Sequence, residues 1–572
     1  MPFLEEKPRF RGISLPPDGW VLTALLVVYI FVGLIGHDPW KHDDAISIGI
    51  AHDIIANGNW LILQPAGRHY PDAPLYHWLA AGFGKLFSWL MPFHDAARMV
   101  SGVFTLLSLE FTLLAARELH GRENAAAAPL ILAGSIGFLF HAHEAQPMLV
   151  ALTAHAAAYW ALALLPRQPG RAVTVFAAAF ATAFLSSGLL PVITLLPAMA
   201  VTVWKTENRS RCLGRLFVGI AAAAVPCGAW LLAVFAASPE YLASFFRTEW
   251  SVLTRPVHPA SNLLRYVSLL LWYAWPALPL AGWTLWSKRR GLKMRAIAIP
   301  AFSFFAVLVL LALLASLRSA TALLLLPPLV LLAAAGIGNL RRGAANAFDW
   351  FGMVTFTFFA ALAWIGWSAL VFGWPERLAR QAVRLEPGFV GVFSAPAFLF
   401  ALACTGVWFW MIVTSPRSPM RGVTHWMAGL TLFWLLIVSF WMPWIDYGKT
   451  FRGVSASLQK ALPAKTNCIA GAGLPLSFLA TLDYFAGIRT VSQKSERAAA
   501  CSWLLVQGAP RADLARAGWR EVWTGNRPTD RRAGEKFHLY RRGRSADPAS
   551  HLDNLAPPAQ PDPAVPSRAR DE

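Results

Sequence analysis

Charged residues are scarce in this 572-residue chain. They make up 14% of it, whereas hydrophobic residues make up 56% and the mean hydropathy is +0.47. An ordinary soluble protein has about 25% charged residues. The deficit therefore excludes the usual soluble classes and predicts an α-helical protein that crosses a membrane many times.

Cysteine is also rare, with five residues in the chain and no Cys-x-x-Cys or Cys/His spacing typical of a metal site. Three of them, Cys212, Cys227 and Cys404, fall in or beside apolar runs, where we expect them to serve as small packing residues. Cys468 and Cys501 lie in a polar C-terminal part, and they could form a disulfide if that part is exported.

Acidic residues are few relative to basic ones, 31 against 50, which gives a net charge of +19. A nucleic-acid-binding protein would gather such charge on one face or tail. Here Lys and Arg form short clusters between apolar runs, as in the cytoplasmic loops of membrane proteins, and the 26 Trp suit aromatic belts at the two interfaces. We therefore reject a nucleic-acid partner and predict a lipid bilayer instead.

Thirteen apolar runs have roughly the length of about 20 residues that a membrane span needs. The first, at 20–35, follows a short basic segment and has no convincing cleavage site, so it is interpreted as a signal anchor. The others lie near 97–116, 124–140, 148–166, 172–187, 188–204, 214–236, 266–286, 296–315, 320–340, 350–373, 393–414 and 424–444. With these spans the basic clusters all fall on the cytoplasmic side, which supports the topology. Because the N-terminal segment is also cytoplasmic, an odd number of spans places the C-terminal part outside.

The remaining segments define three domains: a transmembrane domain at 1–446 with an outer loop at 37–96, an outer α/β domain at 447–540, and a disordered tail at 541–572. In the loop, Ile46, Ile50 and Ile54 predict an amphipathic interfacial helix that ends near Gly58. A second surface helix is expected at 75–90. In the outer domain, helices are expected near 450–462 and 474–486.

Two adjacent carboxylates, Asp43 and Asp44, follow the first span directly. Asp at a helix start stabilises free N–H groups, which is one interpretation. A carboxylate at the membrane interface can also act as a general base on an acceptor hydroxyl or amine. The two roles are compatible, because a helix start is a rigid support.

Other outer-side residues could complete a site. In the loop 141–147, Glu144 and two His could supply an acid opposite Asp43, whereas a metal site is less favoured because no further ligand is evident. Several basic residues fall on the predicted outer side, although Lys and Arg are usually concentrated in cytoplasmic loops. Together they would suit the binding of a phosphate group, whereas for each one alone the alternative is that its side chain extends to the lipid headgroups. They are Arg68, His69, Lys85, Arg247, Arg255, Arg265 and Arg318, with Tyr70 beside the first two.

The segments Trp40–Asp44, Ala56–Leu61 and Gly67–Trp78 form an ordered pattern. It resembles the first outer loop of the GT-C glycosyltransferases, in particular the aminoarabinose transferases and protein O-mannosyltransferases. The resemblance implies a GT-C fold and an inverting transfer of a sugar from a polyprenyl-phosphate donor to a membrane-associated acceptor on the periplasmic face of the bacterial inner membrane. It also implies that Asp43 is the catalytic Asp and Asp44 the following acid.

No cofactor is firmly implied, and a divalent metal stays open. A transporter or flippase of a lipid-linked glycan is the alternative, but such proteins show repeats or ionisable residues within their spans. No repeat is detected in this sequence. A third alternative is a non-catalytic assembly factor that docks through its C-terminal domain.

Overall fold

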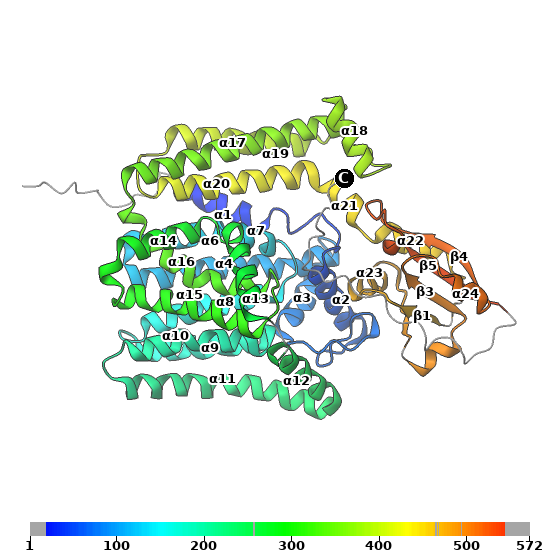
Figure 1. Cartoon of the computed structure of the whole chain (residues 1–572), viewed down its shortest axis with the longest axis horizontal. Helices are drawn as coiled ribbons and strands as arrows, with labels where there is room; N and C mark the ends of the chain where they lie inside the picture. Colours follow the sequence, from blue (N-terminus) through cyan, green and yellow to red (C-terminus); the bar gives the residue numbers. More distant parts are fainter. Residues whose placement is uncertain (1–18, 255–257, 464–465, 467, 494, 544–572) are drawn as a thin grey trace, which may run out of the picture.

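A computed structural model describes residues 19–254, 258–463, 466, 468–493 and 495–543. Most of it is a bundle of long helices, and a smaller domain with a β-sheet lies at one end (Figure 1). Within the described residues, eight helices are long and apolar enough to span a membrane, or nine if one bent pair counts as a span. The predicted helical membrane architecture is confirmed, whereas the count of thirteen spans stays a prediction.

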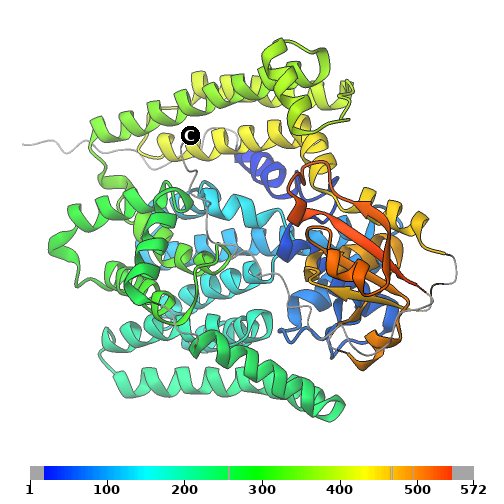
Figure 2. The same ribbon diagram turned by 45° about the vertical axis from the view of Figure 1, so that its right-hand side comes forward.

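The centre of the bundle is formed by α4 (Phe93–His120) and α8 (Pro147–Leu164). From there α9 (Pro169–Ser187) and α11 (Arg209–Ala237) extend to one edge. On the other side α20 (Arg421–Leu436) packs on α17 (Arg342–Phe372), which forms the opposite edge (Figures 1 and 2). The central helices are rich in Ala, Ser and Thr, which let membrane helices approach closely.

The remaining helices of the bundle fill the space between these layers or connect them. They are α1 (Gly19–Phe31), α5 (Arg122–Ala125), α6 (Ala127–Ala133), α7 (Ile136–Ala142), α10 (Leu189–Trp204), α12 (Pro239–Thr254), α13 (Pro259–Tyr273), α14 (Ala277–Ser287), α15 (Arg295–Leu314), α16 (Leu326–Ala334), α18 (Glu376–Leu385), α19 (Ala395–Thr414) and α21 (Met442–Lys449).

Some of these helices differ from the predicted spans. The run at 124–140 is not one straight helix, because the helices before and after Gly134-Ser135 are bent by 65°. The run at 266–286 is divided into α13 and α14 just before Pro276, a residue that cannot continue a hydrogen-bonded helix. Helices α12 and α18 are not apolar runs, so hydropathy does not predict them.

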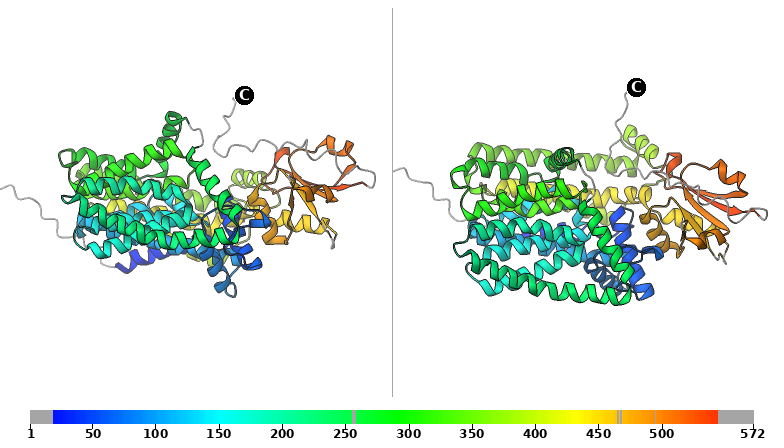
Figure 3. Two further views of the ribbon diagram at one scale, coloured as in Figure 1. Left: turned by 90° about the horizontal axis from the view of Figure 1, so that it is seen from below. Right: turned by 60° about the horizontal axis from the view of Figure 1, so that its bottom comes forward.

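The outer loop contains α2 (His42–Asn57), a short 3-10 turn η1 (Pro65–Gly67) and α3 (Leu75–Phe87). It lies between the bundle and the C-terminal domain (Figures 1 and 3). The predicted end of the first helix is confirmed, because Gly58 caps α2 in a left-handed conformation with φ 70°. However, α2 is buried on most sides by α3 and by helix α23 (Leu476–Ala486) of the C-terminal domain, rather than lying exposed in the interface.

The C-terminal domain begins with α22 (Arg452–Ala461) and α23 (Leu476–Ala486), close to the two helices predicted there. Its sheet has the order β2-β1-β3-β5-β4 and consists of β1 (Ile469–Ala472), β2 (Val491–Ser492), β3 (Trp503–Gln507), β4 (Trp519–Gly525) and β5 (Phe537–Arg542). Strands β2, β1 and β3 are parallel, whereas β5 is antiparallel to β3 and β4.

Cys468 and Cys501 are joined by a disulfide beside this sheet, with their Cα atoms 5.0 Å apart. The small α/β domain predicted from the sequence is therefore present. The predicted tail at 541–572 lies outside the described residues from position 544 onward.

Candidate active site

The first turn of α2 carries the two adjacent carboxylates. Lys41 precedes the helix in an extended conformation and makes no side-chain cap, so neither Asp43 nor Asp44 is the N-cap residue. Both lie where the partial positive charge of a helix start favours an anion. The two side chains nevertheless have different surroundings, and this difference defines the site.

Asp44 is fully engaged by protein groups. Its two oxygens accept bonds from Nε and Nη2 of Arg98, both at 2.8 Å, and Oδ1 also accepts from the Ala145 N–H at 2.8 Å. Asp44 is 1% exposed and Arg98 0% exposed. Burial raises the pKa of Asp44, but the charge and hydrogen bonds of Arg98 outweigh it and hold that pKa at about 2. Asp44 is therefore an ionised anchor between α2 and α4.

Asp43 is only half-buried and has a single polar partner among the described residues. Gln146, at the start of α8, donates from Nε2 to Oδ2 of Asp43 at 3.0 Å. This bond orients the carboxylate and leaves its other oxygen without a protein donor. Asp43 can therefore accept a further hydrogen bond or a proton from a bound molecule.

Glu144 lies in the same region, in the loop that follows α7. Its carboxylate is 3.2 Å from Nζ of Lys41 and 2.5 Å from Nδ1 of His141. Burial raises the pKa of Glu144, but Lys41 and His141 outweigh this and lower it to about 2. Glu144 is thus an ionised acceptor that holds the Lys41 ammonium group, which is 30% exposed, close to Asp43 in the chain.

Tyr70 and Arg318 border the same space from the outer loop and from the segment after α15. Burial raises the pKa of the Tyr70 hydroxyl most, the negative charges of Asp72 and Asp43 raise it further, and Arg318 opposes them. The Tyr70 backbone is fixed by Tyr241, whose hydroxyl donates to the Tyr70 carbonyl at 2.8 Å. Asp43 and the exposed cation Arg318 therefore both lie close enough to Tyr70 to affect its hydroxyl.

The other predicted cations lie elsewhere. Arg68 donates to Thr490 of the C-terminal domain at 3.2 Å, and the exposed ring of His69 lies 6.1 Å from that of Tyr241. Arg265 is exposed on α13 and makes no contact with the carboxylates in the described part of the chain. Arg255 lies outside the described residues. Among the described residues, Arg318 is the predicted Arg that acts on Tyr70 together with Asp43.

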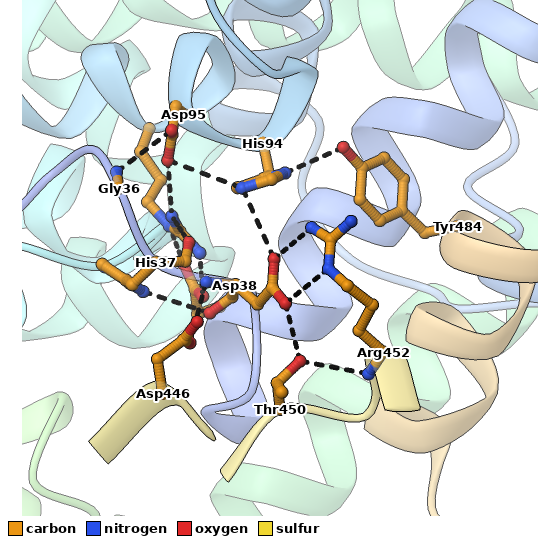
Figure 4. A network of polar contacts seen from close by, with 11 residues as sticks. Gly36, His37, Asp38, His94, Asp95, Asp446, Thr450, Arg452 and Tyr484 are labelled. Carbon is orange, nitrogen blue, oxygen red and sulfur yellow. Dashed lines mark hydrogen bonds and ion pairs between the residues drawn. The ribbon is translucent and has the colours of Figure 1, made fainter. Parts of the chain in front are cut away.

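A second polar network fixes the segment that leads into α2 (Figure 4). Asp38 accepts hydrogen bonds from Arg452 and from Thr450, the latter at 2.7 Å, and its backbone N–H donates to Asp446 at 2.9 Å. Burial raises the pKa of Asp38, but the bonds from Arg452 and Thr450 lower it below its usual value. The C-terminal domain is thereby attached five residues before Asp43.

The network continues on α4. His94 bonds to the Tyr484 hydroxyl of α23 at 2.9 Å, and Asp95 accepts from the Gly36 N–H at 3.1 Å (Figure 4). Sequence reasoning did not identify Arg98 or Gln146. A charged Arg at the start of an apolar run, three residues after an Asp, was a signal for a buried ion pair. Among the described residues, no group of three or more His, Cys, Asp or Glu is arranged to hold a metal ion.

Comparisons with known proteins agree with this architecture, although no family model matches the chain. The chain is 28% identical over 248 residues to an undecaprenyl phosphate-α-4-amino-4-deoxy-L-arabinose arabinosyl transferase of Edwardsiella ictaluri, over 40% of this chain and 43% of that enzyme. The match thus spans less than half of that relative. An enzyme of the same name from Pseudomonas savastanoi pv. phaseolicola is 26% identical over 446 residues, 74% of this chain and 77% of the relative.

The fold is shared with a solved structure. The crystal structure of ArnT from Cupriavidus metallidurans bound to undecaprenyl phosphate superposes with a TM-score of 0.69 at 16% identity, over 94% of this chain and 99% of ArnT. The resemblance to GT-C glycosyltransferases of the aminoarabinose-transferase type is confirmed. The transporter alternative is not favoured.

Proposed function

We propose that this protein is a glycosyltransferase of the bacterial inner membrane that uses a polyprenyl-phosphate-linked sugar as donor. The observation that carries the proposal is the contrast between the two carboxylates at the start of α2. Asp44 is locked by Arg98, whereas Asp43 is oriented by a single bond from Gln146 and keeps a free oxygen. A fixed, ionisable and accessible carboxylate is what a general base requires.

The reaction proposed for this site is a single displacement. An acceptor hydroxyl or amine transfers its proton to Asp43 as it attacks the anomeric carbon. The bond between that carbon and the phosphate oxygen breaks, and the polyprenyl phosphate leaves with the bonding electrons. Attack and departure on opposite faces invert the anomeric configuration. We propose Lys41 and Arg318 as the cations that stabilise the leaving phosphate, because Lys41 is partly exposed two residues before Asp43 and Arg318 acts on Tyr70.

The similarity to the two arabinosyl transferases supports undecaprenyl phosphate as the carrier and a pentose as the transferred sugar. The acceptor we propose is a lipid or another envelope component, because α2, which carries Asp43, lies with α3 at the end of the bundle (Figure 1).

We place this end of the bundle on the periplasmic side. The chain's clusters of Lys and Arg lie at the opposite ends of the helices: Arg117 in the last turn of α4 and Arg122 after it, Arg167/Arg171 after α8, Lys205/Arg209 after α10 and Lys288/Arg289/Arg290 after α14. Basic loops are retained in the cytoplasm. The disulfide between Cys468 and Cys501 also suits an oxidising compartment for the C-terminal domain.

The test is sugar transfer by purified protein in lipid nanodiscs, with undecaprenyl-phosphate-linked sugars and envelope lipids from a deletion strain as acceptors. Asp43→Asn keeps the shape of the side chain and removes its basicity, so we expect transfer to fall about a hundredfold or more. Asp513→Asn, which alters an exposed carboxylate of the C-terminal domain, is the matched control and should transfer normally.

Both variants should insert and purify like the unmodified protein. Near-normal transfer by a stable Asp43→Asn protein would refute the general-base role. If no lipid-linked sugar supports transfer by the unmodified protein, the glycosyltransferase proposal itself fails.

A further inference from the structure

A short helix, α18, joins the two long helices α17 and α19 at the end of the bundle that carries the active site (Figures 1 and 3). Both long helices are apolar enough to cross a membrane. None of the ten residues of α18 is buried in the structure. The helix therefore presents most of its surface to whatever surrounds the protein at the level of the membrane surface.

The sequence of α18 separates into two faces. At 100° per residue, Arg377, Arg380 and Arg384 fall within about 60° of one another on one side. The opposite side is formed by Leu378, Ala379, Ala382, Val383 and Leu385. A helix with a basic face and an apolar face is typical of segments that lie flat in a membrane interface.

The apolar face is part of a larger exposed surface, which we call the α18 patch. Leu378 is 47% exposed, Val383 59% and Leu385 44%. Large apolar side chains on both sides of the helix continue it, namely Phe372, Trp374, Val390, Val392 and Phe393. Exposed apolar side chains beside two helices that are apolar enough to cross a membrane are suited to contact with lipid.

The three Arg of α18 make no hydrogen bond or ion pair with any other residue that the structure describes. Elsewhere on this end of the molecule, cations are bound by carboxylates, as Arg98 is by Asp44 and Arg452 by Asp38. Glu376 in the first turn of α18 makes no ion pair among the described residues, and Glu386, just after the helix, is buried and lies against Gly448 of α21. Three free guanidinium groups on one face thus lack an anionic partner.

We propose that α18 lies in the periplasmic interface of the inner membrane. There it binds the phosphate groups of anionic phospholipids through Arg377, Arg380 and Arg384. The apolar face enters the acyl boundary, and the basic face meets the headgroups. Guanidinium groups bind phosphate oxygens in a bidentate manner, which fits this occupant. The proposal requires α17 and α19 to span the membrane and is independent of the sugar-transfer reaction.

The position of α18 connects such lipid binding with the active site. The segment after α18 contacts α21 through the Tyr447 hydroxyl, which donates to the Pro387 carbonyl at 3.1 Å, and through the rings of Phe389 and Tyr447, 5.6 Å apart. The preceding residue of α21, Asp446, holds the backbone of Asp38. Lipid bound at α18 would therefore support the segment that leads to Asp43.

Hydrogen exchange of the full-length protein in nanodiscs tests the proposal. One set of discs contains phosphatidylcholine alone, and the other contains equal parts of phosphatidylcholine and phosphatidylglycerol. We expect amides of α18 to exchange about tenfold more slowly in the anionic discs at low salt, and the difference to shrink at high salt. Arg377→Gln/Arg380→Gln/Arg384→Gln should abolish the difference while keeping the protection seen in phosphatidylcholine.

The matched control replaces three exposed Arg of the C-terminal domain, Arg497, Arg516 and Arg520, with Gln and should keep the lipid dependence. Equal exchange of the unmodified protein in both kinds of disc would overturn the proposal. Protection of α18 that occurs only in discs with two copies of the protein would also overturn it, because the patch would then be an interface between copies. Loss of the lipid dependence in the control would assign the effect to overall charge instead.

Discussion

The central and peripheral helices of the bundle are built differently. In α8, 83% of the most apolar stretch is buried inside the protein, against 22% in α11 and 17% in α19. The peripheral helices expose large side chains such as Phe217, Val225 and Leu232 of α11. The central helix α8 instead exposes little, and both central helices carry small or polar residues on their buried faces. One part of the bundle is thus suited to protein contact and the other to lipid.

The polar residues of the central helices form a regular stripe. Ser101, Thr105, Ser108 and Thr112 recur every three or four residues along one face of α4 and are all buried. The Ser108 hydroxyl pairs with Thr153 of α8 at 2.7 Å, and the Ser101 hydroxyl donates to the Glu144 carbonyl at 2.7 Å. Close packing and hydrogen bonds of this kind fix membrane helices relative to one another. Arg98 and Gln146, which hold the two carboxylates, are attached to this rigid centre.

The largest effect on stability is expected at the ion pair between Asp44 of α2 and Arg98 of the central helix α4. Asp44→Asn leaves the Arg98 guanidinium buried without its anion, which should lower the free energy of unfolding by about 3–5 kcal/mol. Denaturant titration of the protein in mixed micelles, followed by far-UV circular dichroism, measures the change.

Two controls separate this effect from the loss of any carboxylate. Asp43→Asn should change the free energy of unfolding by less than about 0.5 kcal/mol, because Asp43 has no charged partner within the described residues. Arg167→Gln, which breaks the exposed pair with Glu118, should be equally mild. Similar losses in Asp43→Asn and Asp44→Asn would contradict the distinction between the two carboxylates.

The next effect concerns packing at the centre. A Cβ atom at Gly137 of α7 would lie 2.3 Å from the ring of Tyr273. That ring is buried and its hydroxyl donates to the Ser319 carbonyl at 2.7 Å, so it has little freedom to move. Gly137→Ala should therefore destabilise the protein by about 1–3 kcal/mol through overpacking. The same titration tests this, and an unchanged midpoint would show that the centre is less tightly packed than the structure indicates.

The features that could be predicted from the sequence are those set by local composition, whereas contacts between distant helices could not be predicted. Apolar runs and basic clusters predicted the membrane fold, the outer loop and the C-terminal domain, because each depends on local composition. The pairing of Asp44 with Arg98 spans 54 positions and depends on how α2 meets α4, which composition does not encode. The two adjacent Asp residues therefore look equivalent in the sequence, although one is locked and the other is accessible.

Broken and amphipathic helices were missed for a related reason. A hydropathy run across 266–286 hides the break before Pro276, and the polar residues of α12 and α18 hide helices that lie beside the spans. Of the predicted cations, Arg318 could be named from its place on the outer side. Its proximity to Tyr70 required the tertiary structure.

A smaller effect is expected at a carboxylate that joins the peripheral and central parts. Glu249 of α12 accepts a bond from the Leu189 N–H at the start of α10 at 2.6 Å. Burial raises the pKa of Glu249 from 4.5 to about 7.

 The Leu189 N–H lowers this pKa, the charge of Asp72 raises it, and burial decides the outcome.

The sign of the pH effect follows from this increase. The folded protein binds the Glu249 proton more tightly than the unfolded chain, so this contribution to stability is fully present below about pH 4.5 and is lost as the pH rises through about 7. Glu249→Gln stays neutral and keeps an acceptor for Leu189. Between about pH 5 and about pH 8, the unmodified protein should lose about 1–2 kcal/mol relative to this variant. Thermal unfolding of both proteins at both pH values measures this. An equal difference in stability between the unmodified protein and Glu249→Gln at the two pH values would contradict the assignment.

The smallest effect is expected at the periphery and completes the comparison with Gly137. Gly228 of α11 and Gly406 of α19 have no atom within 4 Å of the position that a Cβ would occupy. Alanine restricts the unfolded chain and favours a helix over Gly, so Gly228→Ala and Gly406→Ala should be neutral or stabilising by up to about 1 kcal/mol. Each is measured against Gly137→Ala under the same conditions, because all three substitutions add one methyl group to a helix. If the peripheral variants were destabilised as much as Gly137→Ala, α11 and α19 would have protein partners on their exposed faces, and the division into a protein-packed centre and a lipid-facing periphery would be wrong.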